Sequence, residues 1–446
     1  MSKPVFGSPM ANLKILLISP GGAFLSRNDE FRTYMEGSRE MKTILHYWNG
    51  LGAALPTVAG LTPDRHIVSI CDENYETIDF SAPVDLVGLT GMTQQAPRAY
   101  EIADEFRRRG VYVAMGGIHA TVLPVEALEH VDTVLTGEAE NTWPQFLADF
   151  EGGKPLHRYD QKNYPDINLS TIPLPRYDLV AANNYPVVWV QATRGCPLDC
   201  DFCAATRIYG AAYRHKDADQ VAREIVEVKK IWKHAQVGFA DDNMFVNKKW
   251  VHNLLDQFED IPFTWYAQSD ISLAEHPDLL TRLHRNGLRI LFVGFESVNH
   301  ENLATINQNQ WKARRLERYP ESIAAIQGAG IGVYGSFIVG MEEDTTTVFD
   351  EIADFSNANS IMGTQVTILT PFPGSVLRNR LEEARRIVSS DWRLYTAWNC
   401  VITHPHLSAQ EMEEGLLRIY RSVYSEEQLR SRAAYFKNAF RQLVGG

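Results

Sequence analysis

Cysteine is scarce in this chain: its 446 residues contain only five, and three of these lie between positions 196 and 203. Such scarcity excludes a disulfide framework of the kind that holds small secreted proteins together. The other two, Cys71 and Cys400, are too few to hold a second metal cluster. We therefore expect one cysteine-based site and a reducing compartment, the cytoplasm.

Positive charge is also in deficit, and long apolar runs are missing. The chain has 43 Lys and Arg against 55 Asp and Glu, a formal net charge of -12. A nucleic-acid partner would normally demand a basic surface, so a small-molecule substrate is expected instead. The sequence shows no apolar run of about 18 residues, so we expect no membrane span. The length exceeds what one core usually organises and predicts two or three domains.

The clustered cysteines form the sequence CPLDCDFC at positions 196–203. Three thiolates so closely spaced can reach three corners of a four-iron cluster, which leaves one iron open to a small chelating molecule. A zinc site completed by His215 is an alternative, although zinc sites usually pair two Cys-x-x-Cys arms and the second arm is missing. Three unrelated buried cysteines are a further alternative.

The first 150 residues alternate strand-like and helix-like segments, which predicts a doubly wound, Rossmann-like α/β domain. Strands are expected at 14–19, 66–71, 85–90, 112–115 and 133–136. Ligands of such sheets bind outside the carboxyl ends of the strands, and glycine there lets a large flat ligand approach the backbone. Candidate ligand-binding residues at those ends are Asp72, Glu73, Thr90, Gly91, Gly116, Gly117, His119, Gly137 and Glu138.

A proline-rich linker is predicted over 151–186, followed by a partial barrel of six strand-helix units over 187–374. Its strands are expected at 187–193, 237–240, 263–269, 288–295, 332–339 and 365–369. Sites in parallel barrels gather at the carboxyl ends of the strands, and the cysteine loop follows the first strand as that rule requires.

Residues 375–446 are predicted to form a helical C-terminal domain that caps the barrel. Capping-box patterns begin at Ser408 with Glu411 and at Ser425 with Gln428. An aromatic group in this region lines a pocket or belongs to ordinary core, and the sequence leaves both open.

The spacing Cys-x-x-x-Cys-x-x-Cys, with Phe202 before the last cysteine, is similar to the signature of the radical S-adenosylmethionine superfamily. The resemblance implies that Cys196, Cys200 and Cys203 hold a 4Fe-4S cluster. It implies that the open iron chelates S-adenosylmethionine, and that an electron cleaves it to a 5'-deoxyadenosyl radical. A donor such as flavodoxin or ferredoxin would supply that electron.

The same resemblance suggests contacts to S-adenosylmethionine at the strand ends. Asp241 and Asp242 occupy the place where the family receives the ammonium group, and a carboxylate suits a cation there. Glu296 would bind ribose hydroxyls, unless it is a strand-end surface acid. The predicted set is Phe202, Asp241, Asp242, Gln268, Glu296, Ser336 and Pro371.

The order of the domains, with the stretches 88–93, 116–121 and 137–140, resembles the cobalamin-binding branch of that superfamily. This group includes hopanoid and bacteriochlorophyll methylases and the anaerobic magnesium-protoporphyrin ester cyclase. The nine strand-end residues of the first domain would then contact cobalamin. The Asp-x-His-x-x-Gly motif that places histidine under cobalt in many corrinoid proteins is absent. His119 is accordingly a polar contact to the corrin or an ordinary strand-end histidine.

By resemblance, the expected activity is cobalamin-dependent methyl transfer to an unactivated carbon of a small or lipid-like molecule. The rival enzyme reading is hydrogen abstraction without methyl transfer, as in cyclisation, rearrangement or oxidation. A non-catalytic cobalamin or iron-sulfur sensor is the alternative from another class.

Overall fold

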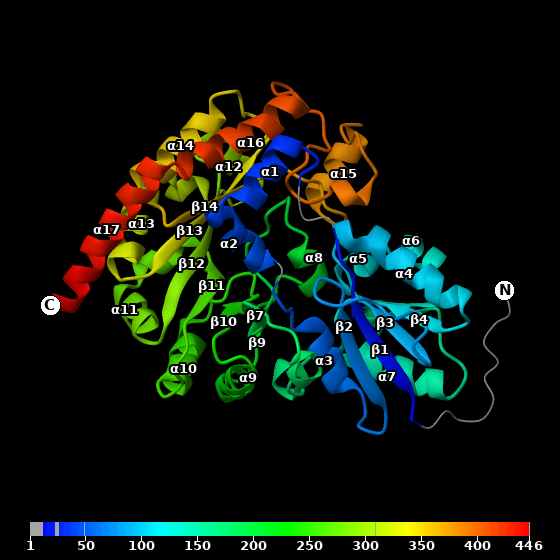
Figure 1. The fold of residues 1–446 in the computed structure, drawn as a ribbon. Coiled ribbons are helices and arrows are strands. Elements are labelled where there is room, and N and C mark those ends of the chain that lie inside the picture. Colours follow the sequence, from blue (N-terminus) through cyan, green and yellow to red (C-terminus); the bar gives the residue numbers. More distant parts are fainter. Residues whose placement is uncertain (1–11, 23–25, 49, 308, 446) are drawn as a thin grey trace.

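The computed structural model describes residues 12–22, 26–48, 50–307 and 309–445. Two six-stranded parallel sheets lie side by side, with helices around them (Figure 1). The α/β class and the order of a Rossmann-like sheet before a partial barrel are confirmed.

The first sheet has the strand order β2-β1-β3-β4-β5-β6, so the chain reverses direction across the sheet between β1 and β3. Its two faces bury different helices, because every second residue points to the same side. Ile15 and Leu17 face α3 and α7, whereas Leu16 and Ile18 face α4. The strands are β1 (Lys14–Ser19), β2 (Ile67–Asp72), β3 (Leu86–Leu89), β4 (Tyr112–Met115), β5 (Thr133–Thr136) and β6 (Arg158–Asp160).

Strand β6 comes from the segment predicted to be a linker. It pairs with β5 in parallel, and buried Tyr159 packs into the core of the first sheet. The helices of this body are α3 (Ala54–Leu61), α4 (Ala96–Arg108), α5 (Gly117–Val122), α6 (Pro124–His130) and α7 (Ala139–Glu151).

The second sheet has the order β14-β13-β12-β11-β10-β7, which is the open half-barrel predicted for this region. Outward residues are buried under helices and inward residues are often half-exposed, as along β12 and β13. The strands are β7 (Val187–Val190), β10 (Gln236–Phe239), β11 (Trp265–Ser269), β12 (Leu288–Glu296), β13 (Gly332–Val339) and β14 (Gly363–Ile368). The helices are α8 (Ala205–Tyr209), α9 (Ala218–Ile231), α10 (Lys248–Phe258), α11 (Pro277–Arg285), α12 (His300–Ile306), α13 (Tyr319–Gly328) and α14 (Val348–Ala358).

Both outer strands of the half-barrel are partnered by segments distant in the sequence. The hydroxyl of Tyr420 bonds the N–H and the carbonyl of Val366 in β14, each at 3.0 Å, and Tyr424 serves Thr364 in the same way. At the other edge, Leu51 bridges Val188 of β7. These contacts satisfy backbone groups that an edge strand leaves unpaired.

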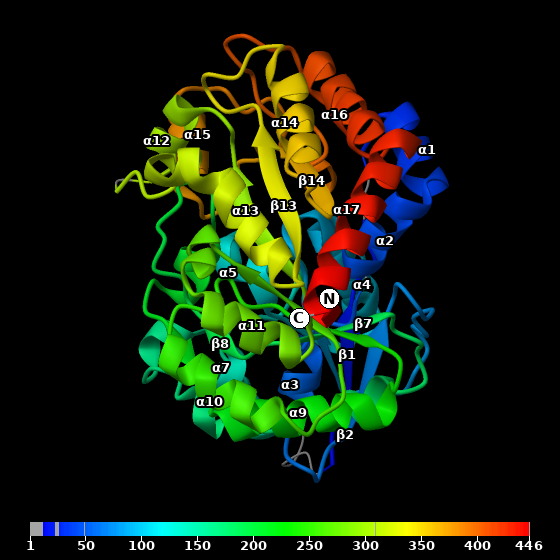
Figure 2. The same ribbon diagram turned by 90° about the vertical axis from the view of Figure 1, so that its left-hand side faces the viewer.

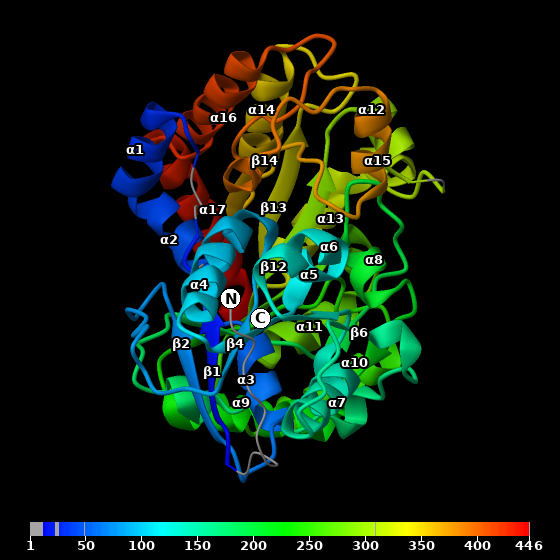
Figure 3. The same cartoon turned by 90° about the vertical axis from the view of Figure 1, so that its right-hand side faces the viewer.

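The N-terminal segment crosses from the first body to the second. Helices α1 (Asp29–Gly37) and α2 (Arg39–Trp48) lie beside the C-terminal helices rather than on the first sheet (Figures 2 and 3). The Tyr34 hydroxyl donates to the Tyr420 carbonyl at 3.2 Å, and the ring of Phe31 packs against Trp398. The sequence gives no sign of this crossing.

The C-terminal region is less helical than predicted. Helix α15 (Val376–Glu383) is followed by a largely irregular stretch before α16 (Ala409–Val423) and α17 (Glu426–Gly445). The capping box of Ser408 and Glu411 is confirmed. Within the described ranges, helices long and apolar enough to cross a membrane are absent.

Candidate active site

The cysteine loop leaves the half-barrel through a narrow neck. Strands β8 (Thr193–Arg194) and β9 (Arg214–His215) pair antiparallel and enclose residues 195–213 between them. Gly195 turns the chain into the loop with φ 87°, and an added Cβ there would lie 2.3 Å from the Ala212 carbonyl oxygen. Only glycine fits that turn, so the neck fixes where the cysteines begin.

The three thiols lie close enough to influence one another electrostatically. Burial raises the pKa of Cys200 to about 12 and that of Cys203 to about 11. The neighbouring thiols add to this, because Cys196 and Cys203 raise the pKa of Cys200 and Cys196 raises that of Cys203. Cys200 is buried, whereas Cys196 and Cys203 are half-buried. A thiolate is poorly solvated when it is buried, so these thiols stay protonated unless a bound metal stabilises the thiolate form.

Neighbouring helices hold the outer side of the loop. The Asp201 N–H donates to the Ile306 carbonyl at 3.0 Å, and the Leu377 N–H donates to the Asp201 carbonyl at 2.9 Å. Arg380 pairs with the Asp201 carboxylate at 2.9 Å. Phe202 packs partly buried against the core. The loop is thus fixed at its neck and at its middle.

The zinc alternative finds little support. The His215 ring stacks on Trp250 at 5.1 Å, and its Nδ1 bonds the Lys216 carbonyl at 3.0 Å. Among the described residues, three histidine, cysteine or acidic side chains nowhere converge as a single-ion site requires. A four-iron cluster spreads its ligands over separate corners, so the loop fits a cluster better than one ion.

The two aspartates after β10 have different surroundings. Asp241 is fully buried, its Oδ2 accepts the Ala192 N–H at 3.2 Å, and burial raises its pKa to about 7. Asp242 is solvent-exposed, and desolvation by the surrounding protein raises its pKa to about 6. Asp241 therefore supports the strand that leads into the cysteine loop, and Asp242 is the carboxylate open to a ligand.

Glu296 ends β12 in the left-handed region, with φ 68°, at an irregularity in the pairing with β13. Its Oε1 receives Lys312 Nζ at 2.5 Å, and the same ammonium donates to the Gly294 carbonyl at 2.6 Å. Burial lowers the pKa of Lys312, but the nearby Glu296 and Cys200 raise it by more. The pKa of Lys312 therefore lies above its usual value. Lys312 lies in an irregular polar stretch without a motif, so the sequence alone gives no signal for its contact with Glu296.

The other residues predicted to contact S-adenosylmethionine lie on neighbouring strands. Gln268 and Ser336 are half-buried, on β11 and β13, and Ser336 stands in register between Gly294 and Gln365. Pro371 is buried after β14, and its carbonyl accepts Arg378 Nη1 at 3.2 Å. Asn243 and Asp270 bond each other at 2.7 Å. The inner face of the half-barrel thus presents small and polar groups beside the cysteine loop.

The carboxyl edge of the first sheet is built from glycine turns. Gly117 begins α5 with φ 86°, and an added Cβ would lie 2.4 Å from Thr90 Oγ1. At Gly91 and Gly116 the nearest atoms to an added Cβ are between 3.6 and 3.9 Å away. Gly91 is buried and Gly116 half-buried at the ends of β3 and β4, where the sequence predicts the corrinoid.

Three of the predicted cobalamin residues use their side chains within the protein. Asp72 accepts the Tyr185 hydroxyl at 3.1 Å, and Glu73 pairs with Arg98 at 2.5 Å. His119 is fully buried, and its Nε2 lies 3.0 Å from the Tyr100 hydroxyl and 3.1 Å from Glu126 Oε1. Its Nδ1 is buried and has no hydrogen-bond partner in the part of the chain that the structure describes.

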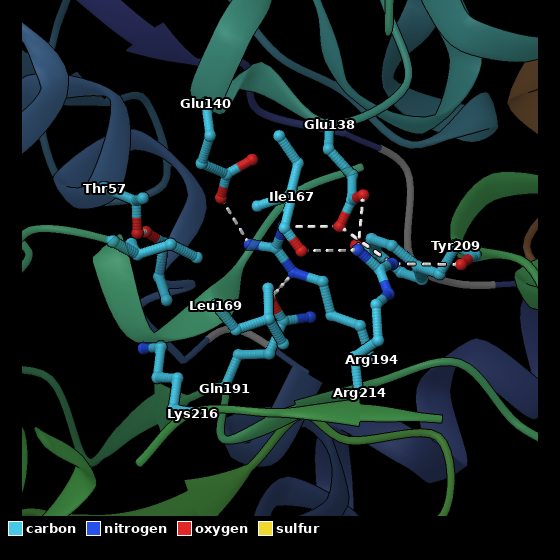
Figure 4. Close-up of polar contacts among 12 residues, drawn as sticks. Thr57, Glu138, Glu140, Ile167, Leu169, Gln191, Arg194, Tyr209, Arg214 and Lys216 are labelled. Atoms are coloured by element: carbon cyan, nitrogen blue, oxygen red, sulfur yellow. Dashed lines mark hydrogen bonds and ion pairs between the residues drawn. The ribbon is translucent and has the colours of Figure 1, made fainter. Parts of the chain in front are cut away.

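Glu138 follows Gly137, which has φ 82°, and its carboxylate meets Arg194 and Arg214 from the neck of the cysteine loop (Figure 4). This engagement leaves the backbone of this turn, rather than the Glu138 side chain, for the predicted contact with cobalamin.

The two candidate cofactor regions adjoin. Helix α5 of the first sheet contacts α8, which starts two residues after Cys203. An added Cβ at Gly374, just after β14, would lie 2.8 Å from a methyl carbon of Val122 at the end of α5. The cysteine loop and the glycine turns of the first sheet therefore belong to one site, and their donors fit a cluster and a large flat ligand.

Comparisons with known proteins agree with this geometry. The family model described as the radical SAM superfamily matches residues 190–356, and the one described as a B12 binding domain matches residues 62–147. Bacteriochlorophyllide d C-8(2)-methyltransferase of Chlorobaculum tepidum is 30% identical over 415 residues, which cover 90% of this chain and 90% of that protein.

Two more distant proteins share the arrangement. The anaerobic magnesium-protoporphyrin IX monomethyl ester cyclase of Rubrivivax gelatinosus is 22% identical, over 76% of this chain and 66% of the cyclase. The structure of TsrM, a radical S-adenosylmethionine methyltransferase from Kitasatospora setae with cobalamin and a 4Fe-4S cluster bound, matches with a TM-score of 0.65 and 15% identity. It covers 94% of this chain and 86% of that chain. This chain belongs to the cobalamin-binding branch of the radical S-adenosylmethionine superfamily, and it is an enzyme with a 4Fe-4S cluster, S-adenosylmethionine and cobalamin as cofactors.

Proposed function

We propose that the enzyme transfers a methyl group to an unactivated carbon of a small or lipid-like molecule. The observation that carries the proposal is the contact between α5 and α8, which brings the glycine turns and the cysteine loop into one site. A methyl donor on the first sheet can then reach a substrate held over the second. The methyltransferase that is 30% identical along nearly the whole chain supports the same reading.

When bound, the cofactors supply a carbon radical and a transferable methyl group. The protein's part is to bind and orient them. Cys196, Cys200 and Cys203 would hold the cluster, and Asp242 would receive the ammonium of S-adenosylmethionine, with Asp241 keeping the preceding strand in place. Further contacts to S-adenosylmethionine are proposed for Phe202, Gln268, Glu296, Ser336 and Pro371.

Cobalamin would lie against the glycine turns at the carboxyl edge of the first sheet. The residues proposed to line it are Asp72, Glu73, Thr90, Gly91, Gly116, Gly117, His119, Gly137 and, through its backbone alone, Glu138. The packed half-barrel and its covered edges would exclude water from the reacting groups.

Two further expectations belong to this proposal. The electron would come from a small donor such as flavodoxin or ferredoxin. The enzyme would work in the cytoplasm, since a cluster with an open iron requires a reducing compartment.

The rival reading is a reaction without methyl transfer, and the ester cyclase relative gives it a specific basis. Anaerobic reconstitution with iron, sulfide and cobalamin, followed by reduction, separates the readings. Methyl transfer yields 5'-deoxyadenosine and S-adenosylhomocysteine together, whereas deoxyadenosine alone favours the rival. Neither product with any reductant would favour a sensor.

A pair of cysteine variants tests the cluster assignment. Cys200→Ala should lose both products, because it removes one of three proposed ligands. Cys400→Ala is the matched control, since Cys400 is also buried but lies outside the loop, where its thiol donates to the Ile402 carbonyl at 3.2 Å. Turnover retained in Cys200→Ala would contradict the assignment.

A further inference from the structure

Four charged side chains join the first sheet to the neck of the cysteine loop (Figure 4). Arg194 donates through Nη1 to Glu138 and through Nη2 to Glu140, both at 2.6 Å. Arg214 reaches the two oxygens of Glu138 at 2.9 and 3.1 Å. The side chains of Arg194, Glu138 and Glu140 are each no more than 9% exposed. The quartet is neutral overall, which makes burial of its charges tolerable.

Each arginine is also oriented by a contact on its own side. Arg194 Nε donates to Gln191 Oε1 at 2.8 Å, and its guanidinium lies over the Tyr209 ring at 5.8 Å. Arg214 Nη2 donates to the Tyr209 carbonyl at 3.1 Å. Both guanidinium groups are therefore aimed before they meet the glutamates, as bidentate recognition requires.

The position of the arginines explains why Glu138 is needed. Arg194 and Arg214 are direct partners across the β8–β9 pair, so their side chains leave the same face of the neck. Like charges placed opposite each other destabilise a strand pair. The carboxylate of Glu138 lies against both and removes that repulsion, so it holds the two arms of the cysteine loop together.

The glutamates are fixed to the first sheet. Glu138 is the residue before α7, and its side chain makes no capping bond to that helix. Glu140 lies in the first turn of α7 and is directed to Arg194. Because β5 and α7 are packed in the core of the first body, the two glutamates fix the cysteine loop relative to that body.

We propose that Glu138, Glu140, Arg194 and Arg214 form a clamp that sets the cysteine loop at a fixed distance from the carboxyl edge of the first sheet. They are positioning residues, since the clamp acts through the cysteines and the glycine turns. The inference rests on the proposed function only in taking that edge as the cobalamin side of the site. It assigns the Glu138 carboxylate to the loop rather than to cobalamin.

The clamp is tested on the full-length apoprotein by amide hydrogen exchange and by titration with hydroxocobalamin. Glu138→Gln should raise amide exchange at 194–204 and 210–215 by about tenfold or more, because buried Arg194 and half-buried Arg214 lose their shared anion. The dissociation constant for cobalamin should stay within about twofold of the wild-type value; a tenfold change would correspond to about 1.4 kcal/mol. The matched control is Glu151→Gln on the same helix, whose ion pair with Arg65 lies away from the neck. It should leave loop exchange unchanged.

A second readout distinguishes positioning from a general loss of stability. In the reconstituted enzyme, Glu138→Gln should retain deoxyadenosine formation and lower methylated product, so that the ratio of the two rises. General destabilisation would lower both in proportion. If Glu138→Gln does not fold, Glu140→Gln, which removes one bond to Arg194, decides with the same measurements.

Unchanged loop exchange in Glu138→Gln would overturn the clamp, and weakened cobalamin binding with unchanged exchange would make Glu138 a cofactor contact instead. A failure of the proposed function looks different. There the wild-type enzyme would give no S-adenosylhomocysteine, while the exchange results on the apoprotein would stand.

Discussion

Gly195→Ala is the sharpest test of how the neck places the cysteines. The added Cβ would lie 2.3 Å from the Ala212 carbonyl oxygen and 3.0 Å from that of Gly210. Both are backbone atoms, so the two arms of the neck must separate by about 0.7 Å before the contact is tolerable. The φ of 87° adds strain of about 1–2 kcal/mol for any residue with a side chain.

Displacing reacting groups by about 1 Å commonly costs about a hundredfold in rate. We expect Gly195→Ala to lose about that much deoxyadenosine formation, and to hold less iron after anaerobic reconstitution. Gly210→Ala in the same loop is the matched control. Gly210 has φ 79°, but no described atom lies within 4 Å of the added Cβ. Gly210→Ala therefore adds backbone strain without a steric clash.

Iron and sulfide content per chain, the deoxyadenosine rate and the free energy of unfolding should be measured for both variants. If Gly195→Ala matches Gly210→Ala in iron content and rate, the neck does not place the cysteines and the reasoning fails.

Two further predictions concern buried charges outside the neck. Lys312→Met should lower the free energy of unfolding of the apoprotein by about 3–5 kcal/mol, because it leaves the buried Glu296 carboxylate without its cation. The double variant, Lys312→Met with Glu296→Gln, should lose less stability than the two single variants added together. Additive losses would contradict the pair. The buried carboxylate of Asp344 accepts the N–H groups of Gly340 and Met341. Burial raises the pKa of Asp344 to about 6, so the wild type should lose about 2 kcal/mol of unfolding free energy relative to Asp344→Asn as pH rises from 4 to 7, because the folded chain keeps a proton that the unfolded chain releases near pH 3.8. Denaturant unfolding at several pH values measures this difference, and parallel stability curves would refute it.

Local patterns were enough to predict most of the framework. Strand β1 and strand β13 fall at the residues that apolar periodicity and the flanking glycines indicate, because a buried parallel strand is a continuous apolar run with short turns. The cysteine loop could be predicted as a site because its three cysteines are close in sequence. The same holds for the capping box at Ser408, whose two partners are three residues apart.

What the sequence hid depends on partners that are far apart along the chain. The Arg194–Glu138 pair spans 56 residues, and Arg27 reaches Glu413 across 386. A glutamate after a strand end looks the same whether it contacts a ligand or an arginine, so Glu138 was assigned by its position alone. Strand β6 could not be predicted from the sequence, because its three residues lie in a proline-rich segment and include only one apolar side chain.

The covering of the half-barrel edges bears on how the enzyme holds two cofactor regions together. Leu51 partners β7, and Tyr420 partners β14 while its carbonyl accepts the Tyr34 hydroxyl. Residues near the start of the chain thus cover the β7 edge directly and hold the helix that covers the β14 edge, although the nearest strands in sequence belong to the first sheet. The two sheets therefore cannot move apart without exposing backbone groups at the β7 edge. Such a construction suits a reaction in which a group held on one sheet must meet a substrate held over the other, because the separation of the two regions is set by folding rather than by a hinge.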